Sequence, residues 1–177
     1  MRDPIDLLLH TLKFAAEKHR MQRRKDPDAS PYINHPITVA SVLYHEAGVR
    51  DLTVLAAAIL HDTVEDTETT FEELREEFGA KIASVVMEVT DDKSLAKAER
   101  KQMQIEHAAH LTPEAQQVKM ADKIANLRDV ASSAPPSWPL ERRMEYFDWG
   151  KQVADQMRGK FPKLDALFDA AYEQKPG

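Results

Sequence analysis

Residues 54–66, with the sequence VLAAAILHDTVED, join an unbroken apolar run to a cluster of ionisable side chains. A helix that is apolar on every side is a buried helix, so the ionisable residues that follow should be buried too or should line a cavity. At about 100° per residue, four of them fall on one side of a helical wheel: His61, Asp62, Glu65 and Asp66. Carboxylates crowded on one face repel one another unless a positive charge lies among them. The stretch therefore favours a bound metal ion.

The alternative for this stretch is a polar helix end that carries one hydrogen-bonded histidine. A lone His–Asp pair is more often of that kind. Here Glu65 and Asp66 add two further carboxylates, and the apolar run leads straight into the cluster. Because of these two features, a metal site is favoured over a hydrogen-bonded histidine for this stretch.

The composition indicates one all-α domain. A chain of 177 residues can bury a sizeable core, and we expect residues 1–177 to form a single domain. Helical periodicity dominates, and only five residues are glycine. The longest apolar run falls far short of the ~20 residues of a membrane span, and the N-terminus lacks the apolar core of a signal peptide. We therefore expect a soluble, cytoplasmic protein that does not bind a membrane.

The charge and the cysteine count exclude several kinds of site. The net charge is −6, from 24 basic and 30 acidic residues, which argues against binding of nucleic acid. The chain has no cysteine, so disulfides and thiolate metal sites are excluded. One segment is basic, with five cations between residues 18 and 25. Such a run is most often a solvated helix end, so by itself it predicts little.

Periodicity and capping signals predict a succession of helices. Asp51 is the expected N-cap of the central helix, Thr70 opens a capping box, and Pro113 suits a first helical turn. The other predicted helices cover residues 5–22, 37–47, 70–79, 81–89, 96–110, 112–127, 141–159 and 162–173.

Two residues outside the central stretch are candidate ligands for the same ion. A metal held only by His61 and Asp62 would be bound weakly. His35 stands next to Pro36 at a predicted helix start, which would hold its imidazole on a rigid element. Asp122 lies in a helix with an otherwise apolar face.

Asp122 has an alternative explanation. Asn126 lies one turn further along the same side of that helix. A lone aspartate in such a helix is more often exposed and paired with a neighbouring lysine, here Lys119 or Lys123. From periodicity alone, the exposed pairing is favoured.

These motifs resemble those of a known family. The order of His35, His61 with Asp62, and Asp122 resembles the ligand order of the HD superfamily of metal-dependent phosphohydrolases. PYINHP (31–36), HDTVED (61–66) and VKMADKIANLRD (118–129) resemble the hydrolase domain of RelA/SpoT proteins, above all its stand-alone form in metazoan SpoT homologues and bacterial small alarmone hydrolases. The resemblance covers nearly the whole chain and is to a hydrolase alone, so no synthetase or regulatory region is expected.

The resemblance implies a compact HD-domain bundle of roughly eight to ten helices and a (p)ppGpp 3′-pyrophosphohydrolase that yields GDP or GTP plus pyrophosphate. It implies metal ligation by His35, His61, Asp62 and Asp122, usually of Mn²⁺. It assigns catalysis to Glu65 and Asp66. It implies substrate contacts at Arg24, Lys25, Asn126 and Tyr146, with Lys97 and Arg142 as weaker candidates for phosphate contacts.

The implied site makes chemical sense. Two imidazoles and two carboxylates suit Mn²⁺, Fe²⁺ or Zn²⁺ better than Mg²⁺. Glu65, one turn beyond His61, is placed to accept a proton from water, and Asp66 to orient that water. The roles of the two acids are interchangeable at this level. Arg24 can stack its guanidinium on a purine base.

Two other functions remain open. Removal of the 2′-phosphate of NADPH, or hydrolysis of another nucleotide, would present a ribose-attached phosphate to the same metal. A helical scaffold without metal is the alternative from a different class of protein, and the complete ligand set counts against it. The sequence carries no prediction of oligomeric state.

Overall fold

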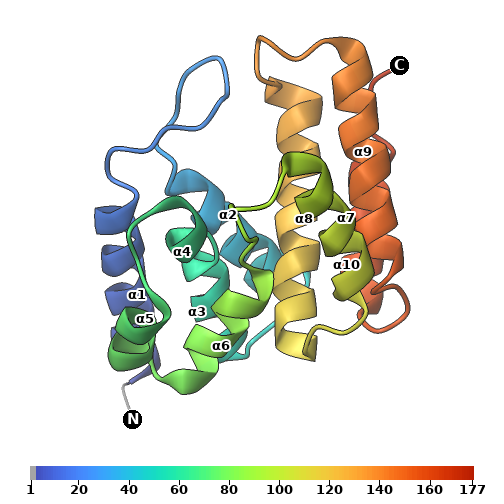
Figure 1. Ribbon diagram of the computed structural model, residues 1–177. Coiled ribbons are helices and arrows are strands. Elements are labelled where there is room, and N and C mark those ends of the chain that lie inside the picture. Colours follow the sequence, from blue (N-terminus) through green and yellow to red (C-terminus); the bar gives the residue numbers. More distant parts are fainter. Residues whose placement is uncertain (1–2) are drawn as a thin grey trace.

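The computed structural model describes residues 3–177, and its regular elements are all helices (Figure 1). They are α1 (Pro4–Lys18), α2 (Asn34–Ser41), the π-helix η1 (Val42–Glu46), α3 (Leu52–Leu60), α4 (Thr63–Asp66), α5 (Phe71–Phe78), α6 (Ala80–Val89), α7 (Lys97–Ala108), α8 (Pro113–Ser133), α9 (Leu140–Asp155) and α10 (Pro162–Tyr172). The predicted all-α bundle of eight to ten helices is confirmed. Residues 1 and 2 of the predicted domain lie outside the described residues, and the domain's extent stays a prediction. None of the described helices is long and apolar enough to cross a membrane.

Helix α3 is the central element of the bundle. Every side chain from residue 54 to residue 60 is buried, and the helix packs against α1, α2, α6 and α8. Full burial of one aliphatic side chain contributes roughly 1.5–3 kcal/mol, so this short helix is firmly anchored. The predicted N-cap is confirmed, because the Thr53 amide donates to Asp51 Oδ1 at 2.8 Å. The element that carries the metal-site motif is therefore rigid.

The expectation of one continuous helix through residue 66 is wrong. Helix α3 ends at Leu60, and Asp62 has φ −101° and ψ 0°, far from the helical ψ of about −42°. Side chains take up the last carbonyls of the helix: His61 Nδ1 donates to the Ala58 oxygen at 2.6 Å, and Thr63 Oγ1 to the Leu60 oxygen at 2.7 Å. The four ionisable residues are therefore divided between the α3–α4 junction, which carries His61 and Asp62, and the short helix α4, which carries Glu65 and Asp66.

Helix α8 packs against α3 and carries the whole VKMADKIANLRD motif. Its predicted cap is confirmed, because Thr112 Oγ1 accepts from the Ala115 amide and Pro113 occupies the first turn. The expected exposure of Asp122 is wrong, since its side chain is only 14% exposed. Lys123 does contact it at 3.5 Å, but that lysine is buried as well. Because α8 packs on α2, α3, α6 and α9, it is buried on several sides and periodicity alone misjudges it.

Several predicted helix ends shift by a few residues. Helix α2 begins at Asn34, so His35 lies inside its first turn and not at the cap. The predicted 37–47 helix finishes as the π-helix η1, and Gly48 then adopts φ +72°, a conformation that glycine tolerates best. Helix α1 ends at Lys18, which leaves residues 19–33 as a long loop beside the start of α2. That loop carries four of the five cations of the basic segment, and Lys18 ends α1.

Candidate active site

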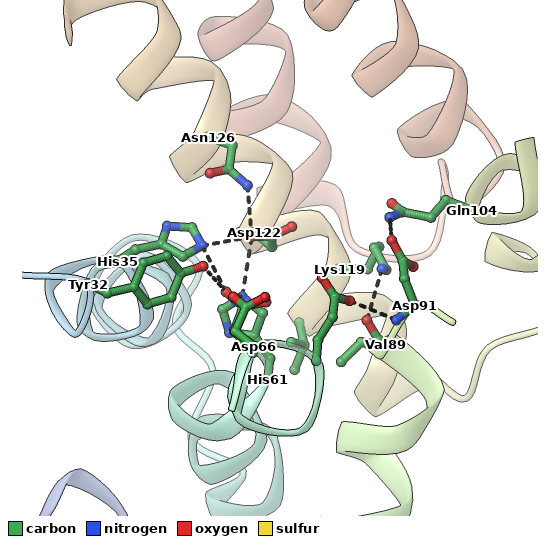
Figure 2. A pocket seen from close by; sticks show the side chains of 13 residues that line it. Tyr32, His35, His61, Asp66, Val89, Asp91, Gln104, Lys119, Asp122 and Asn126 are labelled. Carbon is green, nitrogen blue, oxygen red and sulfur yellow. Dashed lines mark hydrogen bonds and ion pairs between the residues drawn. The ribbon is translucent and has the colours of Figure 1, made fainter. Parts of the chain in front are cut away.

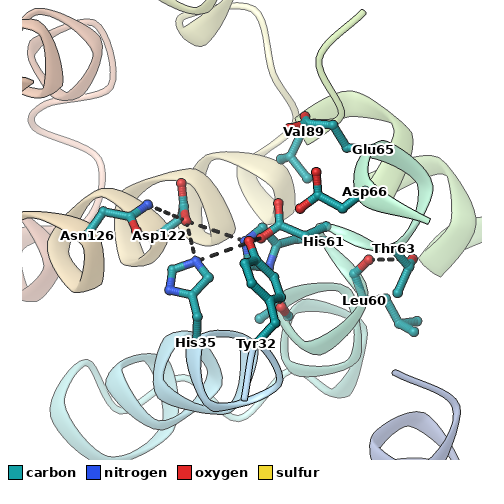
Figure 3. Close-up of polar contacts among 12 residues, drawn as sticks. Tyr32, His35, Leu60, His61, Thr63, Glu65, Asp66, Val89, Asp122 and Asn126 are labelled. Atoms are coloured by element: carbon teal, nitrogen blue, oxygen red, sulfur yellow. Dashed lines mark hydrogen bonds and ion pairs between the residues drawn. The ribbon is translucent and has the colours of Figure 1, made fainter. Parts of the chain in front are cut away.

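Three separate elements bring two imidazoles and two carboxylates together (Figure 3). His35 comes from the first turn of α2, His61 and Asp62 from the junction of α3 and α4, and Asp122 from α8. One ligand atom from each of the first three lies within 4.8 Å of the others. Asp122 Oδ1 lies 2.9 Å from His35 Nε2 and 3.4 Å from His61 Nε2. The structure thus assembles the four residues that the sequence singles out.

The hydrogen bonds of His61 fix which nitrogen faces the cluster. Its Nδ1 lies 2.6 Å from the Ala58 carbonyl oxygen, which can only accept, so Nδ1 carries the hydrogen. In the neutral ring Nε2 then presents a lone pair toward the carboxylates, and this buried atom has no hydrogen-bond partner among the described residues. A histidine whose second nitrogen is bound to a backbone carbonyl is a common arrangement for a metal ligand.

Without a metal ion, the negative charges of Asp62 and Asp122 are compensated only if His61 holds an extra proton. Burial works against the imidazolium, but Asp62 and Asp122 outweigh it and raise the pKa of His61 well above its ordinary value. Burial likewise opposes ionisation of Asp122, yet Lys123 and the two histidines hold its pKa well below the usual range. A divalent cation can replace that proton among the same donors, so the residues present fit a metal ion.

Glu65 and Asp66 follow on α4 and sit in different surroundings. Glu65 Oε1 accepts from the Asp91 amide at 2.8 Å, and burial raises the pKa of its carboxyl to about 7. Asp66 is bound at both oxygens, by Lys93 Nζ at 2.7 Å and by Gln22 Nε2 at 3.2 Å. Among the described residues, Oε2 of Glu65 has no hydrogen-bond partner. Glu65 therefore has a free oxygen and Asp66 has none.

The structure also shows residues that sequence reasoning missed. The missed residue Tyr32 donates its hydroxyl to Asp62 Oδ2. Asn126, which the sequence predicts as a substrate contact, donates from Nδ2 to Asp122 Oδ1 at 2.9 Å, so both carboxylates are held in place. Tyr32 stands in the PYINHP motif, three residues before His35, and that position was the available signal. Gln22, predicted as the end of the 5–22 helix, lies in a loop, as does Asp91, so only the folded chain reveals their roles.

The predicted site residues line three neighbouring pockets. The first, of about 180 Å³, holds the His–Asp cluster, both acids and Asn126 (Figure 2). The second, of about 680 Å³, is lined by Arg24, Lys25, Asn126 and Tyr146. The third, of about 480 Å³, adds Lys97 and Arg142. Each of the three pockets shares lining residues with the other two, so the His–Asp cluster adjoins both the aromatic pocket and the cationic one.

Aromatic and basic side chains are combined in the two larger pockets. The Tyr146 ring lies 5.5 Å from the rings of both Trp138 and Trp149, and Arg142 lies over Trp138 at 4.3 Å. Partial burial and then the neighbouring cations, Arg142 first, lower the pKa of Lys97. Mutual repulsion of this kind indicates a place for an anion, and flat rings beside it suit a nucleotide base.

Arg24 lines the second pocket and is held there by hydrogen bonds. Its Nη2 donates to Asp129 Oδ2 at 2.7 Å and, at 3.4 Å, to Asn126 Oδ1. The guanidinium also lies over the Tyr32 ring at 5.5 Å. Its predicted role in stacking on a base stays a prediction, while its position at the pocket is a finding.

Comparisons with known proteins agree with this arrangement. The HD domain family matches residues 11–145. A protein of Danio rerio named guanosine-3′,5′-bis(diphosphate) 3′-pyrophosphohydrolase MESH1 is 57% identical over 92% of this chain and 92% of its own length. The Homo sapiens protein of the same name is 51% identical over 95% and 94%.

A solved structure matches at a TM-score of 0.93 with 46% identity, covering 98% of both chains. It is described as a metazoan ortholog of SpoT that hydrolyses ppGpp and plays a role in starvation responses. A likeness this close over whole chains extends well beyond the site motifs.

Replacement of His61 by alanine should abolish tight metal binding. Loss of an outer partner of a metal ligand already costs about 10–100-fold in affinity, so loss of the imidazole itself should weaken Mn²⁺ binding by roughly 100-fold or more. Isothermal titration calorimetry measures this, with circular dichroism to confirm folding. His110→Ala, an exposed histidine, is the matched control and should bind Mn²⁺ as the wild type does. A folded His61→Ala protein with wild-type affinity would contradict the assignment.

Proposed function

The chain belongs to the HD-domain family, among the MESH1-type relatives of SpoT, and we propose that it is a guanosine-3′,5′-bis(diphosphate) 3′-pyrophosphohydrolase. It converts (p)ppGpp to GDP or GTP and pyrophosphate. One observation supports this most strongly: the His–Asp cluster and Glu65 share a pocket that opens onto an aromatic, cationic space of nucleotide size. Proteins of that name are similar to this chain over more than nine-tenths of its length.

The proposed metal ligands are His35, His61, Asp62 and Asp122, and the proposed ion is Mn²⁺, with Fe²⁺ and Zn²⁺ as alternatives for the same donors. When bound, the ion supplies Lewis acidity: it lowers the pKa of water and neutralises charge on a phosphoryl oxygen. Tyr32 and Asn126 each hold one carboxylate of the set by a hydrogen bond, so the donors are oriented before any ion arrives.

Glu65 is the proposed general base. Its Oε2 is free among the described residues, and its pKa of about 7 lies near neutral pH, where a base accepts a proton most effectively. Water attacks the phosphorus next to the ribose, one of its protons passes to Glu65, and the bond from that phosphorus to the 3′ oxygen breaks. The 3′ oxygen takes up a proton and leaves as the ribose 3′ hydroxyl, so water is added across the broken bond. Asp66, bound at both oxygens by Lys93 and Gln22, orients the neighbouring groups. The structure gives the two acids different surroundings, which favours this division of roles.

The two larger pockets are the proposed nucleotide site. Arg24 and Tyr146 offer flat surfaces for the guanine base, and Asn126 lies between them and the cluster. Lys25, Lys97 and Arg142 gather at the far end, where the 5′-phosphates would lie. A cationic pocket of this kind strengthens charge-assisted hydrogen bonds to phosphate.

A second candidate activity is removal of the 2′-phosphate of NADPH. The second and third pockets share Lys25, Trp138 and Tyr146, and together they offer space for a dinucleotide. The same cluster would act on either ribose-attached phosphorus, so the choice between these substrates depends on the pockets and not on the ligands.

Release of pyrophosphate from ppGpp and of phosphate from NADPH, measured side by side, tests the proposal. We expect Mn²⁺-dependent pyrophosphate release from ppGpp that a chelator abolishes. NADPH turnover alone would keep the metal site but overturn the substrate. Absence of turnover with both nucleotides, in protein shown to contain Mn²⁺, would contradict the proposed function.

Replacement of Glu65 by glutamine should leave Mn²⁺ binding intact and reduce turnover. General bases contribute roughly 10²–10⁴-fold, and the amide cannot take the proton. In the wild type, kcat/KM should rise with pH because the protonated carboxyl is inactive. The midpoint should lie at or below about 7, since the bound cation lowers the pKa from its metal-free value.

A pH–rate profile of both proteins measures this, and the variant should lack the acidic limb. Glu76→Gln, an exposed surface change on α5, is the matched control. A Glu65→Gln protein that loses Mn²⁺ in proportion to its activity would instead make Glu65 a ligand.

A further inference from the structure

Lys119 on α8 is a buried cation without a role in the scheme above. Its residue is only 7% exposed, and its Nζ makes a single long hydrogen bond, 3.4 Å to the Val89 carbonyl oxygen. None of the ion pairs found among residues 3–177 includes it. A buried ammonium group with so little compensation is costly. Such a group is retained most readily where an anion comes to meet it.

The other buried lysine of the helix shows the contrast. Lys123 contacts Asp122 at 3.5 Å and lies over the Trp149 ring at 4.2 Å. Its charge is therefore compensated inside the protein. Lys119, one turn before Asp122 on the same helix, lines the pocket of the cluster instead.

The position of Lys119 in that pocket is specific. The cluster pocket and the large nucleoside pocket have Tyr32, His35, Asp66 and Asn126 in common. Lys119 lines only the first of the two, and Figure 2 shows it beside Val89 and Asp91, on the side away from Tyr32 and His35. The third pocket meets the cluster pocket at Asp91 and Gln104 and does not include Lys119 either. A group in contact with Lys119 would thus lie inside the cluster pocket, on the side opposite Tyr32 and His35.

The acidic groups at this end already have donors of their own. Asp91 Oδ2 accepts from Gln104 Nε2 at 2.6 Å, and Glu65 Oε1 accepts from the Asp91 amide. Both donors are neutral, so they leave the ammonium charge of Lys119 available. Among the residues that line the cluster pocket, Lys119 is the one lysine or arginine, so it is the cation that an anion inside this pocket can bind.

We propose that Lys119 binds the distal phosphoryl group of a ribose-linked pyrophosphate. This inference rests on the proposed function and deepens it. The phosphorus under attack is the one next to the ribose. A pyrophosphate ester carries a second phosphoryl group beyond that phosphorus, whereas a monophosphate ester carries none. Lys119 then selects 3′-pyrophosphates over 3′- or 2′-monophosphates, while the cluster treats the reacting phosphorus of all three alike.

The test uses two nucleotides that differ only in that group: ppGpp and guanosine 5′-diphosphate 3′-monophosphate. In Lys119→Met, kcat/KM for ppGpp should fall roughly 10- to 100-fold, the range of a lost charge-assisted hydrogen bond. For the monophosphate it should change less than about threefold. Lys81→Met, which removes an exposed lysine paired with Glu114, is the matched control and should alter neither. Mn²⁺ content is measured in all proteins.

A binding measurement gives a readout without turnover. In the Glu65→Gln background with Mn²⁺ bound, ppGpp should bind at least about tenfold more tightly than the monophosphate. Addition of Lys119→Met should remove that difference.

Equal losses on both nucleotides, or no loss on ppGpp, would overturn the inference. If Lys119→Met does not fold, the wild type alone tests the inference. Equal kcat/KM of the wild type for the two nucleotides would also overturn the inference. A wild type that turns over neither nucleotide would instead refute the proposed function.

Discussion

The structure depends on one constraint: two carboxylates and two imidazoles are mostly removed from water, and each imidazole lies within 3.8 Å of both carboxylates. Asp62 and Asp122 cannot both stay ionised in such a place without a positive charge between them. In the structure, a raised pKa at His61 and the buried Lys123 provide it. A divalent cation provides it more completely, and the surrounding hydrogen bonds already point the donor atoms inward.

The bundle places this cluster through two helices of different kinds. Helix α3 is apolar on every side, and its C-terminal end carries His61 into the core, where Ala58 fixes the orientation of the ring. Helix α8 is long and passes the same point, so Asp122 and Lys119 reach it from one turn of backbone. The proposed catalytic acids are then held by the chain after α6, since the Asp91 amide donates to Glu65 and Lys93 donates to Asp66. Site geometry therefore depends on packing between elements distant in sequence.

Much of this was predictable from sequence, and the exceptions have physical causes. An all-α fold follows from periodicity, and His61 with Asp62 stands out because charged residues directly follow an apolar helix. The break after Leu60 was not predictable, because it depends on side chains that take up helix carbonyls. Asp122 was misjudged by periodicity because α8 is covered on several sides. The family resemblance implies that Asp122 is a metal ligand, which periodicity alone does not predict. Periodicity also favours Lys119 as an exposed partner of Asp122, whereas in the fold Lys119 is buried.

The most direct test of the account is anomalous diffraction at the manganese edge from crystals grown with Mn²⁺. We expect one strong peak among His35 Nε2, His61 Nε2 and the carboxylates of Asp62 and Asp122, with Glu65 close by but outside the coordination sphere. A peak elsewhere, or a cluster that stays closed by its own hydrogen bonds in protein saturated with Mn²⁺, would contradict it.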